Sequence, residues 1–303
     1  MPGPRRTFTK AACLLSLLLA GCVASGGGSV PSSAVLSNMP GPQGVEEQVS
    51  RRQLWLIPSP DPGHLMRTTL LRPVGKGPFP LVVVNHGSEQ DAIERSRMPL
   101  PDFDTVTEWF LARGYAVLLP QRPGHGETGG RYLEDQGRCS NADFGKSGRA
   151  TADSIAMAID FMTRQSFIKP DGVVIVGNSA GGWGALSLAS RNPANVRAIV
   201  NFSGGRGGRN LGKANKNCSP QKLISAAESF GRSARTPTLW LYAENDTYFS
   251  PDLSKRMAEA YRTAGGTMEF HLLPAVVGEG HNLIQTSGPA ATWTPYVEKF
   301  LSH

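Results

Sequence analysis

"VVIVGNSAGGWG", residues 173–184, is the stretch that decides how this chain folds. It opens with an unbroken apolar run, which is typical of a strand buried on both faces. The run passes directly into Gly-Asn-Ser-Ala-Gly, and a helix is predicted to follow over 182–191. A G-x-S-x-G pattern between a strand and a helix predicts a sharp turn that exposes the serine hydroxyl, here that of Ser179. The alternative is that Ser179 is an ordinary small residue of a glycine-rich loop.

Such a turn needs small residues on both sides of the serine, and Gly177 and Gly181 meet this need. The helix that follows directs its N-terminal amides and the positive end of its dipole at the same point. We therefore predict that Ser179 is a nucleophile. The backbone N–H of Ala180 is then one expected donor to the oxyanion formed on attack.

A serine hydroxyl needs a base to take its proton, and after such a turn the expected order is Ser, then Asp or Glu, then His. Of the six histidines, only His271, His281 and His303 follow the region that can supply the acid. His271 lies within a predicted strand and His303 ends the chain. His281, in "GEGHNL", lies in the loop before the last predicted helix and is the predicted base.

The acid is expected just beyond the strand 237–243, in "AENDTYFSP". Asp246 is the predicted partner of the base because it lies on the turn after this strand. Glu244 is the main competitor and Glu279 a more distant one, and a solvated loop carboxylate is the alternative for each.

A second oxyanion donor is expected after the strand 79–87, which ends in "NHG". His86 and Gly87 let the backbone turn close to a substrate, so the N–H of Ser88 is the candidate, with Glu89 as its neighbouring alternative. His86 itself is interpreted as a structural hydrogen-bonding residue.

From residue 50 onward, predicted strands and helices alternate along the chain. The strands are 52–57, 66–71, 79–87, 115–120, 172–177, 196–204, 237–243 and 267–273, and the helices are 103–113, 150–162, 182–191, 220–230, 251–264 and 292–301. This alternation predicts an α/β fold with three layers, in which helices flank a mostly parallel central sheet.

The N-terminus has the pattern of an export signal. Arg5, Arg6 and Lys10 precede an apolar run that is too short to span a bilayer. "LAGC", residues 19–22, resembles the lipobox of bacterial lipoproteins, and this resemblance implies that Cys22 is lipidated. We therefore expect a signal peptide over 1–21, a Gly-, Ser- and Pro-rich linker over 22–48, and one domain over 49–303 in a bacterial cell envelope.

Charge and cysteine content limit the partners. The formal net charge of +7 falls to about +4 without the signal, and the remaining basic residues are scattered, so no nucleic-acid partner is expected. Membrane contact is expected only through the lipid. No cofactor and no metal are expected, because no ligand set has metal-binding spacing. In an oxidising compartment Cys139 and Cys218 are expected to form a disulfide, and two unpaired thiols are the alternative.

With these residues in place, the chain resembles the α/β-hydrolase superfamily over about 50–303, and most closely its dienelactone-hydrolase-like and prolyl-oligopeptidase-like esterase branches. The motifs that carry the resemblance are "NHGS", "PQRPGHGETGG", "GNSAGG", "AENDTYFSP" and "GEGHN". The resemblance implies a triad of Ser179, Asp246 and His281. True dienelactone hydrolases use a cysteine where this chain has Ser179, which favours hydrolysis of an ordinary carboxylic ester. A peptidase or acyl-peptide hydrolase, and a catalytically silent envelope lipoprotein that binds a ligand, are the alternatives.

Overall fold

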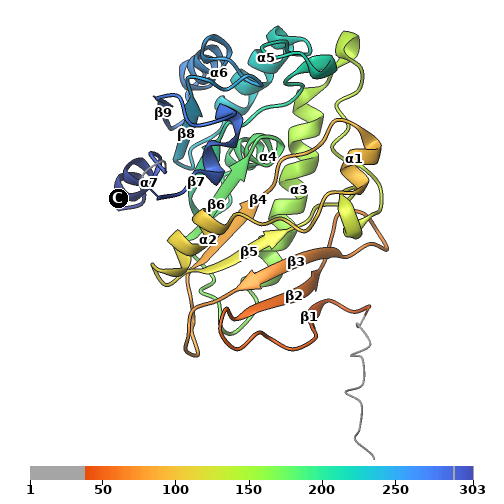
Figure 1. Ribbon diagram of the computed structural model, residues 1–303, viewed down its shortest axis with the longest axis vertical. Helices are drawn as coiled ribbons and strands as arrows, with labels where there is room; N and C mark the ends of the chain where they lie inside the picture. The colour runs from red at the N-terminus through yellow and green to blue at the C-terminus, as the bar shows by residue number, and fades with distance from the viewer. Residues whose placement is uncertain (1–37, 289–290, 303) are drawn as a thin grey trace, which may run out of the picture. The chain divides into compact units, whose positions relative to one another are not determined.

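One sheet organises the residues that the computed structural model describes, 38–288 and 291–302. Its strands are β1 (Gly41–Gln43), β2 (Arg52–Ile57), β3 (Met66–Leu71), β4 (Leu81–Asn85), β5 (Ala116–Pro120), β6 (Val173–Asn178), β7 (Val196–Phe202), β8 (Thr238–Ala243) and β9 (Met268–Leu273). They lie in the order β1-β2-β3-β5-β4-β6-β7-β8-β9 (Figure 1). β1, β2 and β3 are antiparallel to their neighbours, and β5, β4, β6, β7, β8 and β9 run parallel.

Helices cover both faces of the sheet. The α-helices are α1 (Ala92–Ser96), α2 (Asp104–Leu111), α3 (Phe144–Met162), α4 (Ala180–Ala189), α5 (Pro220–Gly231), α6 (Pro251–Thr263) and α7 (Thr294–Leu301). Short 3-10 turns are η1 (Gly126–Thr128), η2 (Cys139–Asn141), η3 (Asn210–Gly212) and η4 (Gly280–Gln285). The three predicted layers are therefore present, as Figure 1 shows.

The central strands are buried on both faces, which explains their unbroken apolar runs. In β4, Val83 packs into the core formed with α3, α4, α5 and α6, while Val82 and Val84 pack into the core formed with α2 and α7. Alternate residues of a strand point to opposite faces, so a strand covered on both sides needs apolar residues at every position.

The structure departs from the sequence-based prediction at three places, and one of them is α1, where no helix was predicted. β1 lies inside the range 22–48 where only a linker was expected, so the sheet begins earlier than predicted. α3 begins at Phe144 rather than at residue 150, and Asp143 caps it by accepting a hydrogen bond from the N–H of Lys146 over 2.7 Å. The first turns of α3 contain Gly145 and Gly148, which weaken the helical signal.

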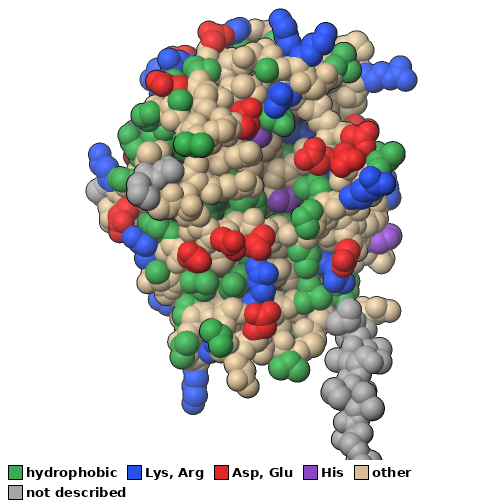
Figure 2. Space-filling view, viewed as in Figure 1, with side chains coloured by type: hydrophobic (Ala, Val, Ile, Leu, Met, Phe, Trp, Pro, Cys, Tyr) green, Lys and Arg blue, Asp and Glu red, His purple; other side chains and the backbone are tan. Residues whose placement is uncertain are grey.

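The two edges of the sheet differ from its centre. β1 is one edge and contains Pro42. β9 is the other edge, and Glu269 is exposed on it beside the half-buried His271. Across one face of the domain, acidic and basic side chains are interspersed (Figure 2).

The predicted export signal and lipidation site belong to the N-terminal part of the chain. The predicted lipidation site, Cys22, and the predicted signal peptide lie outside the described residues. Within 38–288 and 291–302, the helices are all too short or too polar to cross a membrane.

Candidate active site

Ser179 lies on a strained turn between β6 and α4, where the sequence places it. Its φ is +53° and its ψ is −118°, a backbone conformation that non-glycine residues rarely adopt. The turn packs closely on its neighbours: a Cβ added to Gly177 would lie 2.5 Å from the carbonyl carbon of Gly181, and one added to Gly181 would lie 2.3 Å from the carbonyl oxygen of Asn85. Only glycine fits at these two positions, so both small residues of the motif are explained.

Asp246 and His281 come together from separate loops, as predicted. Asp246 follows β8, and His281 lies in η4, between β9 and α7. The Nδ1–H of His281 donates to Asp246 Oδ2 over 3.2 Å, and the other oxygen of Asp246 accepts from the N–H groups of Tyr248 and Phe249 over 2.8 and 2.9 Å. Both side chains are buried. A carboxylate held in this way fixes the tautomer of the imidazole and leaves Nε2 free to accept a proton.

The two competing acids have different positions. Glu244 is exposed on the loop, away from the bonds that hold His281. Glu279 is half-buried, and it accepts from the N–H of His281 over 3.1 Å and from the N–H and hydroxyl of Thr247 over 2.9 and 2.6 Å. Burial alone would raise the pKa of Glu279, but these hydrogen bonds outweigh it and lower the pKa below its usual value. Glu279 therefore ties the loop of the base to the loop of the acid.

Two aromatic rings support the imidazole of His281. The ring of Tyr248 stacks on it with 4.1 Å between centroids and 17° between planes, and that of Phe249 lies 5.5 Å away. His281, Ser179 and Tyr248 line the same cavity. Among the described residues the hydrogen bond from His281 to Asp246 is formed, whereas none joins His281 to Ser179. A bond of that kind often tightens only when substrate is bound.

Both predicted oxyanion residues lie beside the serine. Ser88 and Ala180 line a cavity together with Ser179, and a Cβ added to Gly87 would lie 3.3 Å from the Cβ of Ser179. The chain after β4 therefore passes directly over the nucleophile. Glu89, the alternative to Ser88, lines the same cavity but is exposed.

The Ser88 hydroxyl belongs to a directed chain of hydrogen bonds. His125 Nδ1 faces the carbonyl oxygens of Arg122 and Pro123 at 3.2 and 3.1 Å, so Nδ1 carries the proton. His125 Nε2 then accepts from the Ser88 hydroxyl over 2.9 Å. Burial lowers the pKa of His125 to about 4, which keeps the ring neutral near pH 7. The side chain of Ser88 is thus fixed beside the site, and His125 acts as its scaffold.

The family model described as "Dienelactone hydrolase family" matches residues 66–299. The chain belongs to the dienelactone hydrolase family. The protein is accordingly a hydrolase of the α/β-hydrolase type. None of the curated proteins compared matches the chain.

Solved structures with the same fold include other hydrolases. An esterase from Pyrococcus furiosus is 17% identical with a TM-score of 0.57, over 83% of this chain and 91% of that one. Acetyl xylan esterase 1 from Thermoanaerobacterium sp. JW/SL YS485 is 14% identical with a TM-score of 0.57, over 87% of each chain. An acylaminoacyl peptidase from Pyrococcus horikoshii is 14% identical with a TM-score of 0.60, over 82% of this chain and 41% of that one. At these identities the likeness concerns the fold.

This member of the dienelactone hydrolase family also has a buried ionic cluster behind the site that sequence reasoning missed. Glu134 accepts from both Arg122 and Arg206, and all three side chains are buried. Burial alone would raise the pKa of Glu134, but Arg122, His125 and Arg206 lower it to about 2, with Arg122 the largest contributor. Arg206 also donates to the hydroxyl of Tyr132 over 2.6 Å. Because 72 or more residues separate Arg206 from these partners, no local pattern could have indicated the contact.

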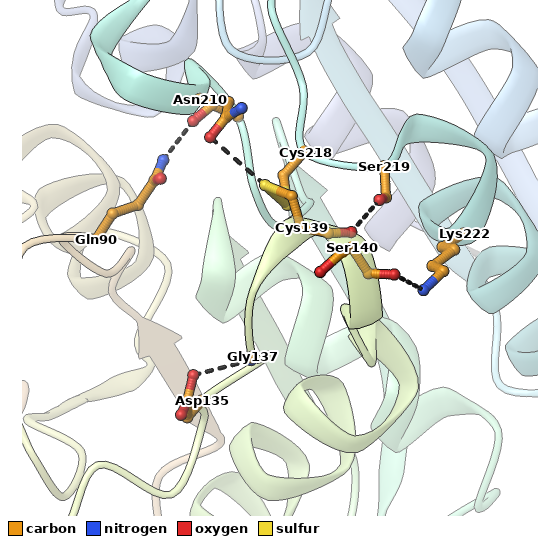
Figure 3. Close-up of a disulfide and its surroundings, with 10 residues drawn as sticks. Gln90, Asp135, Gly137, Cys139, Ser140, Asn210, Cys218, Ser219 and Lys222 are labelled. Atoms are coloured by element: carbon orange, nitrogen blue, oxygen red, sulfur yellow. Dashed lines mark hydrogen bonds between the residues drawn. A yellow bond between two sulfur atoms is a disulfide. The ribbon is translucent and has the colours of Figure 1, made fainter.

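The expected disulfide is present in this dienelactone hydrolase family member. Cys139 and Cys218 are bonded with 5.0 Å between their Cα atoms, and they join η2 to the loop before α5 (Figure 3). Both line the cavity that holds Ser179. The residues 205–208 are buried and form one wall of this cavity.

Proposed function

We propose that the protein is a serine-dependent carboxylic-ester hydrolase whose triad is Ser179, His281 and Asp246. The observation that supports this most directly is the pairing of His281 with a buried Asp246 on the rim of a cavity that also exposes the strained Ser179. The family supplies the broader class, a hydrolase. Membership alone does not select a bond type, so the proposal rests on this geometry.

The reaction follows from the positions of these groups. His281 Nε2 takes the proton of the Ser179 hydroxyl as Oγ attacks the carbonyl carbon of the ester. The backbone N–H groups of Ala180 and Ser88 would hold the oxyanion that forms. The intermediate collapses as His281 passes its proton to the departing alcohol, which leaves an acyl group on Ser179. Water then gives a proton to His281 and attacks the acyl carbon. The bond from that carbon to Ser179 Oγ breaks, His281 returns the proton to Oγ, and the acid leaves. No cofactor enters this scheme.

The test is labelling of the soluble fragment from about residue 38 by a fluorescent fluorophosphonate, with Ser179→Ala as the matched control. We expect the parent to be labelled, the variant to remain unlabelled, and hydrolysis of p-nitrophenyl acetate by the variant to fall about 10⁴-fold or more. A folded parent that takes no label would contradict the proposal and favour a binding protein. Faster cleavage of peptide amides than of matched esters would favour a peptidase.

We also propose that the chain is exported and held in the bacterial envelope by lipid on Cys22. The apolar run and the "LAGC" sequence support this. In a bacterial expression host we expect the full chain in the membrane fraction and the variant Cys22→Ala in the soluble fraction. Retention of the variant in the membrane would contradict the lipid anchor without affecting the catalytic proposal.

A further inference from the structure

Two cavities of different kinds meet at Ser179. The inner cavity, about 260 Å³, is lined by Ser179, Ala180, the loop 205–208, the segment 135–139 and Cys218, among others. The outer cavity, about 770 Å³, contains His281 and extends to Arg209, Leu211 and Gln285. His281 lines the outer cavity and lies outside the lining of the inner one.

The position of His281 assigns the two halves of an ester to these cavities. The departing alcohol receives its proton from His281, so its oxygen must lie on the side where His281 is placed. The acyl group extends from the same carbonyl carbon in another direction, past Ala180, and enters the inner cavity. We infer that the protein selects esters with a short acyl group and tolerates a bulky alcohol, and that the Cys139–Cys218 disulfide is the far wall of the acyl site. This inference rests on the proposed ester hydrolysis.

The inner cavity is small, and its glycine wall cannot move back. Its volume lies below the range of about 300–1,000 Å³ that is common for small-molecule sites. A Cβ added to Gly205 would lie 2.6 Å from the ring of Phe249, and one added to Gly207 would lie 2.8 Å from the Cβ of Cys218. Gly205 and Gly207 are already in close contact with Phe249 and Cys218, so a longer acyl chain cannot displace this wall without breaking that packing.

The opposite wall of the inner cavity, the segment 135–139, is held at both ends. At one end Arg206 donates to the carbonyl oxygen of Glu134 over 2.6 Å. At the other end lies the disulfide, where the N–H of Cys218 donates to the carbonyl oxygen of Gly207 over 2.8 Å and the hydroxyl of Ser219 donates to the carbonyl oxygen of Cys139. Figure 3 shows Ser219 reaching the carbonyl oxygen of Cys139 and Lys222 reaching that of the next residue, Ser140. The bridge therefore fixes the distance between the two loops that enclose the acyl site.

Polar groups make the inner cavity unsuitable for a long alkyl chain. Tyr132, Asp135, Arg138 and Asn210 all contribute to its lining. An alkyl chain that displaced water from these groups would remove hydrogen bonds to water without replacing them, which is costly. A short acyl group avoids that contact.

The experiment compares p-nitrophenyl acetate, butyrate and octanoate in the parent and in the double variant Cys139→Ser, Cys218→Ser. In the parent we expect kcat/KM to fall about 100-fold from acetate to octanoate, as expected when methylenes do not fit a site. Opening the far wall should raise the octanoate-to-acetate ratio about tenfold. Leu211→Ala, which alters only the outer cavity, is the matched control, and it should leave this ratio unchanged while changing the preference among acetates of different alcohols.

Each outcome decides between the two proposals. Equal rates for acetate and octanoate in the parent would overturn the acyl-site assignment while leaving ester hydrolysis intact, and this needs no variant to fold. An unchanged ratio in a folded double variant would overturn the role of the disulfide. For a double variant that does not fold, Gln136→Phe replaces it: narrowing the inner cavity should reduce butyrate hydrolysis at least tenfold more than acetate hydrolysis, and equal effects on both would overturn the assignment. No hydrolysis of any ester, together with no fluorophosphonate labelling, would overturn the proposed function and this inference with it.

Discussion

Two carboxylates separated by one residue, Glu244 and Asp246, have different environments although they share a loop. Glu244 is exposed, whereas Asp246 is buried and holds His281 with one oxygen and two backbone N–H groups with the other. Burial with satisfied hydrogen bonds makes Asp246 suited to orient an imidazole, because each of its oxygens has a fixed direction.

Replacing the buried carboxylate should reduce catalysis far more than replacing the exposed one. We expect Asp246→Asn to lower kcat for an acetate ester by about 10⁴-fold, since an amide no longer selects the required tautomer of His281. Glu244→Gln is the matched control and should retain parental activity. Steady-state kinetics on both variants would check this, and equal losses in the two would contradict the assignment of the acid.

The stacked ring of Tyr248 is predicted to position His281. Tyr248→Ala should lower kcat about tenfold through loss of orientation, with a smaller change in KM. Tyr248→Phe keeps the stacked face and should restore the rate. The two variants compared by kcat and by thermal unfolding distinguish positioning from general stability, and failure of the phenylalanine variant to rescue would contradict the role of the stack.

At the scale of elements, the disulfide links segments that are 79 residues apart in the sequence. A cross-link of this kind restricts the unfolded chain, and its removal should lower the free energy of unfolding by about 2–4 kcal/mol. Urea denaturation of the double serine variant, compared with the oxidised and the reduced parent, measures this value. Titration of thiols in the unfolded, unreduced parent should find neither Cys139 nor Cys218 free, and two free thiols would contradict the bridge.

The elements that the sequence predicted well are those with local causes. β6 and β8 are confirmed because strands buried on both faces need apolar residues at every position, and the turn at Ser179 is confirmed because its glycines allow a close approach that other residues cannot. The first turns of α3 were missed because tertiary contact stabilises them: the buried carbonyl of Phe144 accepts from the indole of Trp183 over 2.8 Å.

The parts of the site that sequence could not supply are those made by distant contacts. His281 was predictable because the order of the triad along the chain limits the choice. The contacts of Arg206 with Tyr132 and Glu134 were not, since they depend on how two loops fold over the end of the sheet. Residues 205–208 line the inner cavity, and their close packing against Phe249 and Cys218 also depends on contacts between distant parts of the chain.

At the scale of the whole molecule, the buried histidines should make stability depend on pH. The pKa of His125 is lowered from 6.5 to about 4; burial is the main cause, Arg122 and Arg206 act in the same direction, and Glu134 opposes them. Between these pH values the unfolded chain binds a proton that the folded chain does not. The free energy of unfolding should therefore be fully retained above pH 6.5 and fall as the pH is lowered from 6.5 to about 4. His86 acts in the same direction, because burial lowers its pKa as well.

The measurement is urea denaturation at several pH values between 7 and 4 for the parent and for His125→Gln. Glutamine can still accept from Ser88 but does not titrate, so the variant should lose less stability on acidification. An equal loss in both proteins would contradict the assignment. At lower pH, protonation of Glu134 should continue the decline in the free energy of unfolding. The pKa of Glu134 is about 2 in the folded protein, so as the pH falls the unfolded chain takes up this proton before the folded protein does.

The two edge strands of the sheet, β1 and β9, affect whether copies of the protein can associate through their sheets. An edge strand presents unpaired amide groups to which another chain can add a strand, and long, flat, apolar edges invite aggregation. Here β1 spans Gly41–Gln43 and contains Pro42, which has no N–H to offer, while β9 carries Glu269 and His271. Both features discourage edge-to-edge addition. A protein crowded on a surface at high local concentration would benefit from borders of this kind, because they keep neighbouring copies from joining their sheets.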